Sequence, residues 1–450
     1  MIKTSKYDMT PLRQWIFALG GAGFNLLERL IVLYVPFYFL PPIEYGVPNL
    51  IPEGAFWGFA TVLGIALVVG RIIDGLADPI IASLSDNSRS PLGRRKVFML
   101  WSGLPLAAFG SLIFFPPQPG DVSMLNGVWL GAILCLFYIA YTGYVNPFLS
   151  LISDLGHTED LRLKLSTKVA LFGLMATLAV TAGLPMLVTW LTGGGISLRA
   201  AYQIAVVSFS AVAAILLYAA TLGFTESRPK LEQSPPTTGT WASLRDTYTY
   251  KPFRIFVLGE MLLQYGINIM TMALLYYVVV IFKKPEGFMS IIAAVIVAVA
   301  LASFPIVNYV TRKNGKKKVL IVGVCVLVLC SSALFFLSFN MTGVLAIVGV
   351  AVLALAGIPL AVLAILINPT IAGMARAHTL QTGVPKEAMF FAARAIPVKL
   401  VIALAGATFG FLLAVFGKDL ARPLGVQLSM LVIALAGVGA LLFFLQLPND

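Results

Sequence analysis

Long apolar segments alternate with short polar or basic segments along the whole chain. Each apolar segment approaches the roughly 20 residues that a helix needs to cross about 30 Å of hydrocarbon. The expected membrane helices cover residues 12–40, 55–83, 97–115, 128–152, 167–192, 201–224, 255–282, 288–310, 319–339, 343–369, 389–415 and 424–446. This pattern predicts an all-α membrane protein with about twelve transmembrane helices.

The composition excludes an ordinary soluble protein. Apolar residues make up 59% of the 450 residues and charged residues only 11%, whereas soluble domains are about half apolar and about one quarter charged. The first apolar run has no small-residue cleavage site, so we interpret it as a retained helix and not a signal peptide. Three cysteines, Cys135, Cys325 and Cys330, lie within apolar segments, where we expect small buried hydrophobic side chains.

One hydrophilic segment, residues 225–254, is longer than all others and contains the turn-forming sequences PP and TTGT. We interpret it as a cytoplasmic linker between an N-terminal six-helix bundle, residues 1–224, and a C-terminal six-helix bundle, residues 255–450. A basic segment follows the second helix of each half, SDNSRSPLGRRK and TRKNGKKK. Two parallel halves of this kind enclose a binding site at the middle of the membrane.

The formal charge of +12 follows membrane topology and does not indicate a nucleic-acid partner. Basic residues gather in alternate loops, as cytoplasmic loops require: Arg89, Arg94, Arg95 and Lys96, then Arg162, Lys164 and Lys168, then Arg312, Lys313, Lys316, Lys317 and Lys318. We therefore expect both termini in the cytoplasm, a bacterial inner-membrane location and a monomer. His157 and His378 are expected in cytoplasmic loops, exposed to solvent.

Ionisable residues inside a membrane helix cost at least about 2.5 kcal/mol, so each needs a partner or a function. In VVGRIIDGLADPI, Arg71, Asp74 and Asp78 follow one another at spacings of three and four and share one helical face. Two carboxylates one turn apart repel each other unless a cation or a proton lies between them. Arg71 could instead neutralise one aspartate as a buried pair, but a single arginine cannot compensate both. The pattern favours a cation site.

The fourth helix contains YIAYTGYVNPFLS, in which the Thr142 hydroxyl and the loosened backbone around Asn146 and Pro147 offer neutral oxygen atoms. Oxygen ligands suit sodium, and a carboxylate alone suits a proton, so either coupling ion fits and no cofactor is expected. Glu28 and Arg29 are adjacent and point about 100° apart, so they need not pair with each other.

Three further charges lie within the expected membrane helices of the C-terminal half, Glu260, Arg394 and Lys399. Glu260 and Arg394 are expected to extend toward the cytoplasmic surface. Lys399 either pairs with a carboxylate on another helix or contacts the substrate or the cation site.

Three sequence segments resemble a known family. VVGRIIDGLADPIIASLSDNSRSPLGRRKVFML, YTGYVNPFLSLISDL with EDLRLKLS, and TGVPKEAMFFAARAIPVKL are similar to the glycoside-pentoside-hexuronide:cation symporters, the melibiose-permease-like branch of the major facilitator superfamily. The resemblance implies a twelve-helix fold of two six-helix halves. It also implies a cation site of Asp74, Asp78 and Thr142, with Arg71 as charge partner and Lys399 between the cation and substrate sites.

The chain departs from the family pattern at the ion site and at the substrate site. Ala77 stands where an asparagine is expected, which removes a neutral oxygen. Asn25 and Val145 stand where sugar-binding aspartates are expected, and Lys168 is only near the expected arginine. The chain also resembles the sodium-dependent lysophospholipid carriers of animals. The candidate substrate-binding residues are Asn25, Arg29, Tyr141, Val145, Glu260 and Lys399.

The expected function is therefore cation-coupled symport, with sodium or protons, of a small organic solute that is glycoside-like or anionic and amphiphilic. The mechanism would be alternating access. Two alternatives stay open: a lysophospholipid transporter or flippase, and an uncoupled facilitator. We do not expect an enzyme, because no nucleophile with its base, no metal-ligand spacing and no phosphate-binding loop is present.

Overall fold

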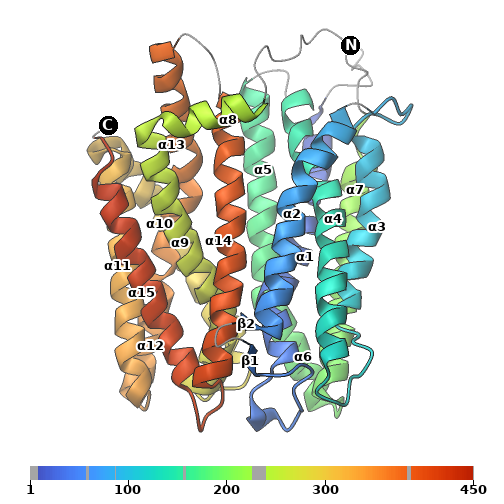
Figure 1. The fold of residues 1–450 in the computed structure, drawn as a ribbon, viewed down its shortest axis with the longest axis vertical. Coiled ribbons are helices and arrows are strands. Elements are labelled where there is room, and N and C mark those ends of the chain that lie inside the picture. The colour runs from blue at the N-terminus through green and yellow to red at the C-terminus, as the bar shows by residue number, and fades with distance from the viewer. Residues whose placement is uncertain are drawn as a thin grey trace. The chain divides into compact units, whose positions relative to one another are not determined.

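The computed structural model describes residues 9–56, 60–86, 88–155, 159–225, 240–382 and 387–448. Two compact units make up the chain, residues 1–232 and 233–450. Figure 1 shows that helices build both units, the first coloured blue to green and the second yellow-green to red.

The first unit contains seven α-helices in its described part, and two of them share one membrane segment. They are α1 (Pro11–Phe39), α2 (Val62–Asp86), α3 (Lys96–Leu112), α4 (Met124–Leu155), α5 (Glu159–Leu178), α6 (Leu184–Gly193) and α7 (Leu198–Leu222). The π-helical turn η2 (Ala179–Gly183) joins α5 to α6. Between α1 and α2 lie the short helix η1 (Ile43–Tyr45) and an antiparallel pair of two-residue strands, β1 (Ala55–Phe56) and β2 (Ala60–Thr61).

The second unit begins, in its described part, with a short helix and continues with the membrane helices. The elements are α8 (Thr240–Thr249), α9 (Lys251–Tyr276), η3 (Tyr277–Ile281), α10 (Phe288–Asn314), α11 (Lys316–Leu337), η4 (Ser338–Asn340), α12 (Val344–Leu355), α13 (Gly357–Thr382), α14 (Glu387–Phe416) and α15 (Leu424–Leu445). The π turn η3 extends α9, and α12 and α13 form one membrane segment.

The prediction of an all-α, twelve-helix membrane protein is confirmed. Ten segments of the described chain are long and apolar enough to cross a membrane. The other two expected helices are α2, which carries three charged residues, Arg71, Asp74 and Asp78, among its first 17 residues, and α3, which is apolar but has only 17 residues. Length and apolarity alone would miss both helices.

The same pattern of helix neighbours occurs in each unit. In the first unit α1 packs against α5 and α7, α2 against α4, and α3 against α4 and α7. In the second unit α9 packs against α14 and α15, α10 against α13, and α11 against α13 and α15. When each membrane span of the first unit is matched with the span six positions later in the chain, the same pairs of spans are in contact in both units. Parallel repeats have this property.

Small residues allow the first helix of each unit to approach its neighbours closely. A Cβ atom added at Gly23 would lie 2.7 Å from Leu217 Cγ on α7. One added at Gly259 would lie 2.5 Å from Phe444 Cε1 on α15. Helices in membranes associate through such close packing because lipid tails are as apolar as the side chains.

Several predicted boundaries were wrong. The second helix begins at Val62 and not at residue 55, because β1 and β2 occupy the preceding residues. Lys164 and Lys168 lie on helix α5 and not in a loop. Part of the expected linker is helical, since α8 lies within it and α9 begins at Lys251. Long basic side chains are tolerated at helix ends because their aliphatic stems lie along apolar surface.

The environment predicted for His378 was also wrong. Helix α13 continues to Thr382, so His378 lies within it and is only 4% exposed. Its ring lies 5.4 Å from those of Tyr250 and Phe390. His157 lies outside the described residues.

Candidate cation site

Helices α2 and α4 carry two acidic and two amide or hydroxyl side chains that meet in pairs. Asp74 is fully buried, and its Oδ1 accepts a hydrogen bond of 2.8 Å from the Thr142 hydroxyl. One turn further along both helices, Asn146 Nδ2 donates to Asp78 Oδ1 at 3.0 Å. The two side chains on each helix are four residues apart in the sequence, so they lie on the same helical face. Two rungs of oxygen-bearing side chains therefore connect α2 to α4.

The chemistry of these rungs suits a hard monovalent cation or a proton. Carboxylate, hydroxyl and amide oxygens are the ligands that hard cations prefer. Within the described residues, no group of three or more His, Cys, Asp and Glu side chains could hold a metal ion.

Arg71 lies beside the two contacts between α2 and α4 and itself contacts two carboxylates. Its Nη1 donates to Asp74 Oδ2 at 3.4 Å, and its Nη2 donates to Glu28 Oε1 at 3.1 Å. The guanidinium carbon lies 4.6 Å from the centre of the Tyr138 ring, a cation–π contact. Arg71 thus contacts carboxylates on both α1 and α2, and the alternative of a simple pair between Arg71 and one aspartate is incomplete.

Glu28 is the member of this cluster that the sequence interpretation did not connect to the ion site. Its Oε1 accepts from Arg71, and its Oε2 accepts a hydrogen bond of 3.0 Å from the Tyr141 hydroxyl. The sequence did indicate a contact for Glu28, because a glutamate in an apolar membrane helix needs a partner. The hydroxyl of Tyr141, a candidate substrate ligand, is engaged by this contact.

The other substrate candidates of the first unit lie in different surroundings. Asn25 donates from Nδ2 to the Gly21 carbonyl of its own helix at 2.7 Å. Val145 is 7% exposed and belongs to the packed interior. Among the described residues, Arg29 has a buried Nε atom without a hydrogen-bond partner.

In the second unit, Glu260 and Arg394 form a buried ion pair. Arg394 Nε donates to both carboxylate oxygens of Glu260 at 2.8 Å, and Nη2 adds a further hydrogen bond. The Glu260 side chain is 1% exposed and that of Arg394 is 21% exposed. The expectation that Glu260 extends to the cytoplasmic surface was wrong, because Arg394 on α14 pairs with it inside the unit. Lys399 lies on α14 and is half-buried.

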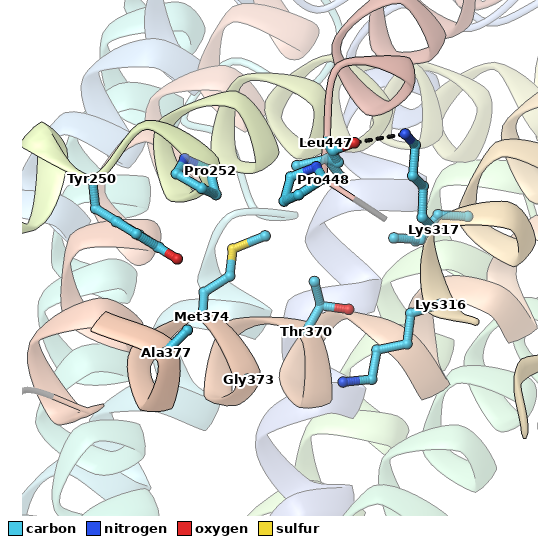
Figure 2. Close-up of a pocket in the computed structure, with 11 residues that line it drawn as sticks. Tyr250, Pro252, Lys316, Lys317, Thr370, Gly373, Met374, Ala377, Leu447 and Pro448 are labelled. Atoms are coloured by element: carbon cyan, nitrogen blue, oxygen red, sulfur yellow. Dashed lines mark hydrogen bonds between the residues drawn. The ribbon is translucent and has the colours of Figure 1, made fainter. Parts of the chain in front are cut away.

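A cavity of about 220 Å³ lies in the second unit near the start of α9 and α11 and the end of α15. Figure 2 shows Lys316, Lys317, Tyr250, Thr370 and Met374 around it. Lys317 Nζ donates to the Leu447 carbonyl at 2.6 Å, and Lys316 Nζ lies 3.3 Å from the Pro369 carbonyl. Leu447 lies just after the end of α15, where a cation stabilises a helix C-terminus, whereas Pro369 lies within α13.

The model of the family described as "MFS/sugar transport protein" matches residues 16–447 of this chain. The chain belongs to this family. Its members are membrane transporters, so the chain is a multi-pass integral membrane protein of a transporter family. The predicted resemblance to cation symporters of the melibiose-permease branch is confirmed.

Curated relatives of this family member carry the names of symporters and sugar transporters. It is 24% identical over 276 residues to "Inner membrane symporter YicJ" of Escherichia coli, which covers 61% of this chain and 55% of that protein. It is 21% identical over 318 residues to "Isoprimeverose transporter" of Lactiplantibacillus pentosus, which covers 70% of this chain and 62% of that protein. The matched segments thus span less than two thirds of these relatives.

Solved structures share the fold over nearly the whole chain. The nucleoside transporter NupG matches with a TM-score of 0.64 at 13% identity, covering 97% of this chain and 99% of that one. A D-xylose-proton symporter matches with a TM-score of 0.64 at 14% identity, covering 97% of both chains. These structures support the fold of this family member.

Proposed function

We propose that this protein is a cation-coupled symporter that works by alternating access, with its cation site formed by Asp74, Asp78 and Thr142. The two rungs between α2 and α4 carry this proposal, because they gather carboxylate, hydroxyl and amide groups inside a membrane helix bundle. Groups of this kind inside a membrane mark ion pathways. Relatives that are named symporters support coupling to an ion.

The coupling ion is sodium or a proton. Asn146 favours sodium, because its amide provides an oxygen after a half-turn about its last side-chain bond, and that oxygen replaces the one missing at Ala77. A proton requires only one of the two carboxylates. The experiment below distinguishes these ions.

A glycoside-like solute is the first proposed substrate class, since a relative is named an isoprimeverose transporter. A second class, anionic and amphiphilic solutes including lysophospholipids, is favoured by Arg29, whose Nε is buried without a hydrogen-bond partner in the described part of the chain. Lys399 on α14 is the candidate cation of the second unit for an anionic substrate. The missing carboxylates at Asn25 and Val145 are consistent with this second class.

A thermal-stability assay on the purified protein tests the coupling. Ligands that bind the native state raise the unfolding temperature by mass action. We expect sodium chloride, compared with choline chloride at the same ionic strength, to raise that temperature and to strengthen the shift produced by one member of a set of glycosides, sugar acids and lysolipids.

Substrate-dependent proton uptake at constant sodium would instead identify a proton symporter. A solute that binds equally well with and without either ion would show an uncoupled facilitator and overturn the proposal.

A further inference from the structure

The Arg71 guanidinium is shared unequally between two carboxylates. Its Nη2 contact with Glu28 measures 3.1 Å, whereas its Nη1 contact with Asp74 measures 3.4 Å. Asp74 receives its shorter described hydrogen bond, 2.8 Å, from the neutral Thr142 hydroxyl. The stronger part of the arginine's charge is therefore directed away from the proposed cation site.

Glu28 is held in a position where it can bind Arg71. Tyr141 donates to its second carboxylate oxygen at 3.0 Å, so both oxygens have a fixed partner. The Tyr141 ring packs edge-on against Phe24 on α1, with ring centres 6.1 Å apart. Hydrogen bonds to charged groups in a low-dielectric interior are stronger than those between neutral groups. Glu28 is thus a preorganised acceptor for Arg71.

Glu28 is not positioned as a third ligand of the ion. No cluster of three acidic side chains close enough for a metal occurs among the described residues, and the Glu28 side chain is 22% exposed whereas that of Asp74 is fully buried. An effect of Glu28 on the ion must therefore pass through Arg71 or through space.

We infer that Glu28 is a positioning residue that holds Arg71 away from Asp74 and thereby sets the affinity of the cation site. This inference rests on the proposed function of Asp74 and Asp78. When the ion is absent, the arginine compensates Asp74 through Nη1. When the ion binds, Glu28 takes the guanidinium, and the aspartates are left to the ion. Arg71 and the ion then compete for Asp74, and Glu28 biases this competition toward the ion.

The test compares sodium affinity in a set of variants, measured by calorimetric titration of the purified protein with sodium chloride and by its proton equivalent, a pH titration of stability. In Glu28→Gln, Arg71 should turn to Asp74, and the dissociation constant for the ion should rise about tenfold, or ~1.4 kcal/mol. Tyr141→Phe removes no charge, and it should weaken ion binding in the same direction by a smaller factor.

A double-mutant cycle separates positioning from simple electrostatics. Arg71→Gln removes the competitor, and Glu28→Gln added to it should change the ion's dissociation constant less than twofold. A continued tenfold loss in that background would show that Glu28 acts through space, and the inference would be wrong. The double variant removes one charge of each sign, so it keeps the net charge of the cluster and serves as the variant that folds if a single one does not.

The outcome for the wild-type protein distinguishes the two proposals. If neither sodium nor protons bind, the proposed function fails. If ions bind and Asp78→Asn abolishes their binding, while Glu28→Gln and Tyr141→Phe leave the affinity unchanged, only the role of Glu28 is excluded.

Discussion

Asn146 on α4 donates a hydrogen bond of 3.0 Å to Asp78 on α2. This contact places an amide beside the second aspartate although the residue before that aspartate is Ala77, which has no polar side chain. An amide has both a donor and an acceptor end, so a half-turn of Asn146 would present its oxygen to an ion held by Asp78.

We expect Asn146→Leu to weaken sodium binding about tenfold and to leave proton coupling intact, because a proton needs only the carboxylate. Sodium titration of the purified variant measures the first quantity, and proton uptake in vesicles measures the second. Ala77→Asn added to Asn146→Leu should restore part of the sodium affinity, since it returns an amide to the residue next to Asp78. Equal losses of sodium and proton coupling would contradict this division of roles.

Asp78→Asn should remove most ion-driven transport while the protein stays folded. The substitution deletes a charge that the membrane interior tolerates only with a partner or an ion, and it keeps the size of the side chain and one oxygen for Asn146. Uptake under an imposed sodium or proton gradient measures the effect, and the unfolding temperature verifies the fold. Wild-type uptake rates under such a gradient would exclude Asp78 from coupling.

The ladder between α2 and α4 was predictable from the sequence only in part. Helical periodicity places Asp74 and Asp78 on one face of α2, because residues four apart are neighbours on a helix. It says nothing of which side chain on another helix lies opposite. The resemblance to a family supplied Thr142, but Glu28 was connected to the site only by its contacts with Arg71 on α2 and Tyr141 on α4.

The environments of Glu260 and His378 show the same limit. Hydropathy places a charged or polar residue near a helix end, and the ordinary expectation there is contact with water. In the structure, α14 brings Arg394 to Glu260, and the rings of Tyr250, at the start of α9, and of Phe390 on α14 lie beside His378. Arg394 and Glu260 are 134 positions apart in the sequence, and local sequence patterns do not encode such a contact.

The topology proposed from the basic loops can be measured by cysteine labelling. After replacement of the native Cys135, Cys325 and Cys330 by alanine, single cysteines at positions 94, 164, 245 and 317 should react only from the cytoplasmic side, because the basic residues there orient the helices. Cysteines at positions 123 and 342, in the intervening loops, are the matched controls and should react from the opposite side. A position of the first group that is labelled only from outside would contradict the proposed orientation.

Lys399 provides a test of substrate class. Its ammonium in a low-dielectric site would attract a carboxylate, sulfonate or phosphate. If it contacts the substrate, Lys399→Ala should weaken binding of an anionic ligand about tenfold more than binding of a neutral glycoside, and Lys399→Arg should retain part of the difference. If it serves the cation site instead, Lys399→Ala should change the sodium constant and leave substrate preference unaltered. Titration of one variant with both kinds of ligand separates these roles.

The pair between Glu260 and Arg394 leads to a prediction about stability. Removing one partner of a buried ion pair leaves an isolated charge and costs about 3 to 5 kcal/mol, whereas replacing both by apolar residues is often neutral. Glu260→Gln should therefore lower the unfolding temperature clearly, and Glu260→Leu combined with Arg394→Met should recover it.

The double variant also tests the expected role of Glu260 in substrate binding. Arg394 donates hydrogen bonds to both carboxylate oxygens of Glu260, so this carboxylate is satisfied without a bound ligand. We expect the double variant to keep wild-type ion and substrate affinities, measured by the same thermal-shift and titration assays. A stable double variant that has lost substrate binding would return Glu260 to the substrate site, and a single variant as stable as the wild type would show that the pair contributes nothing to folding.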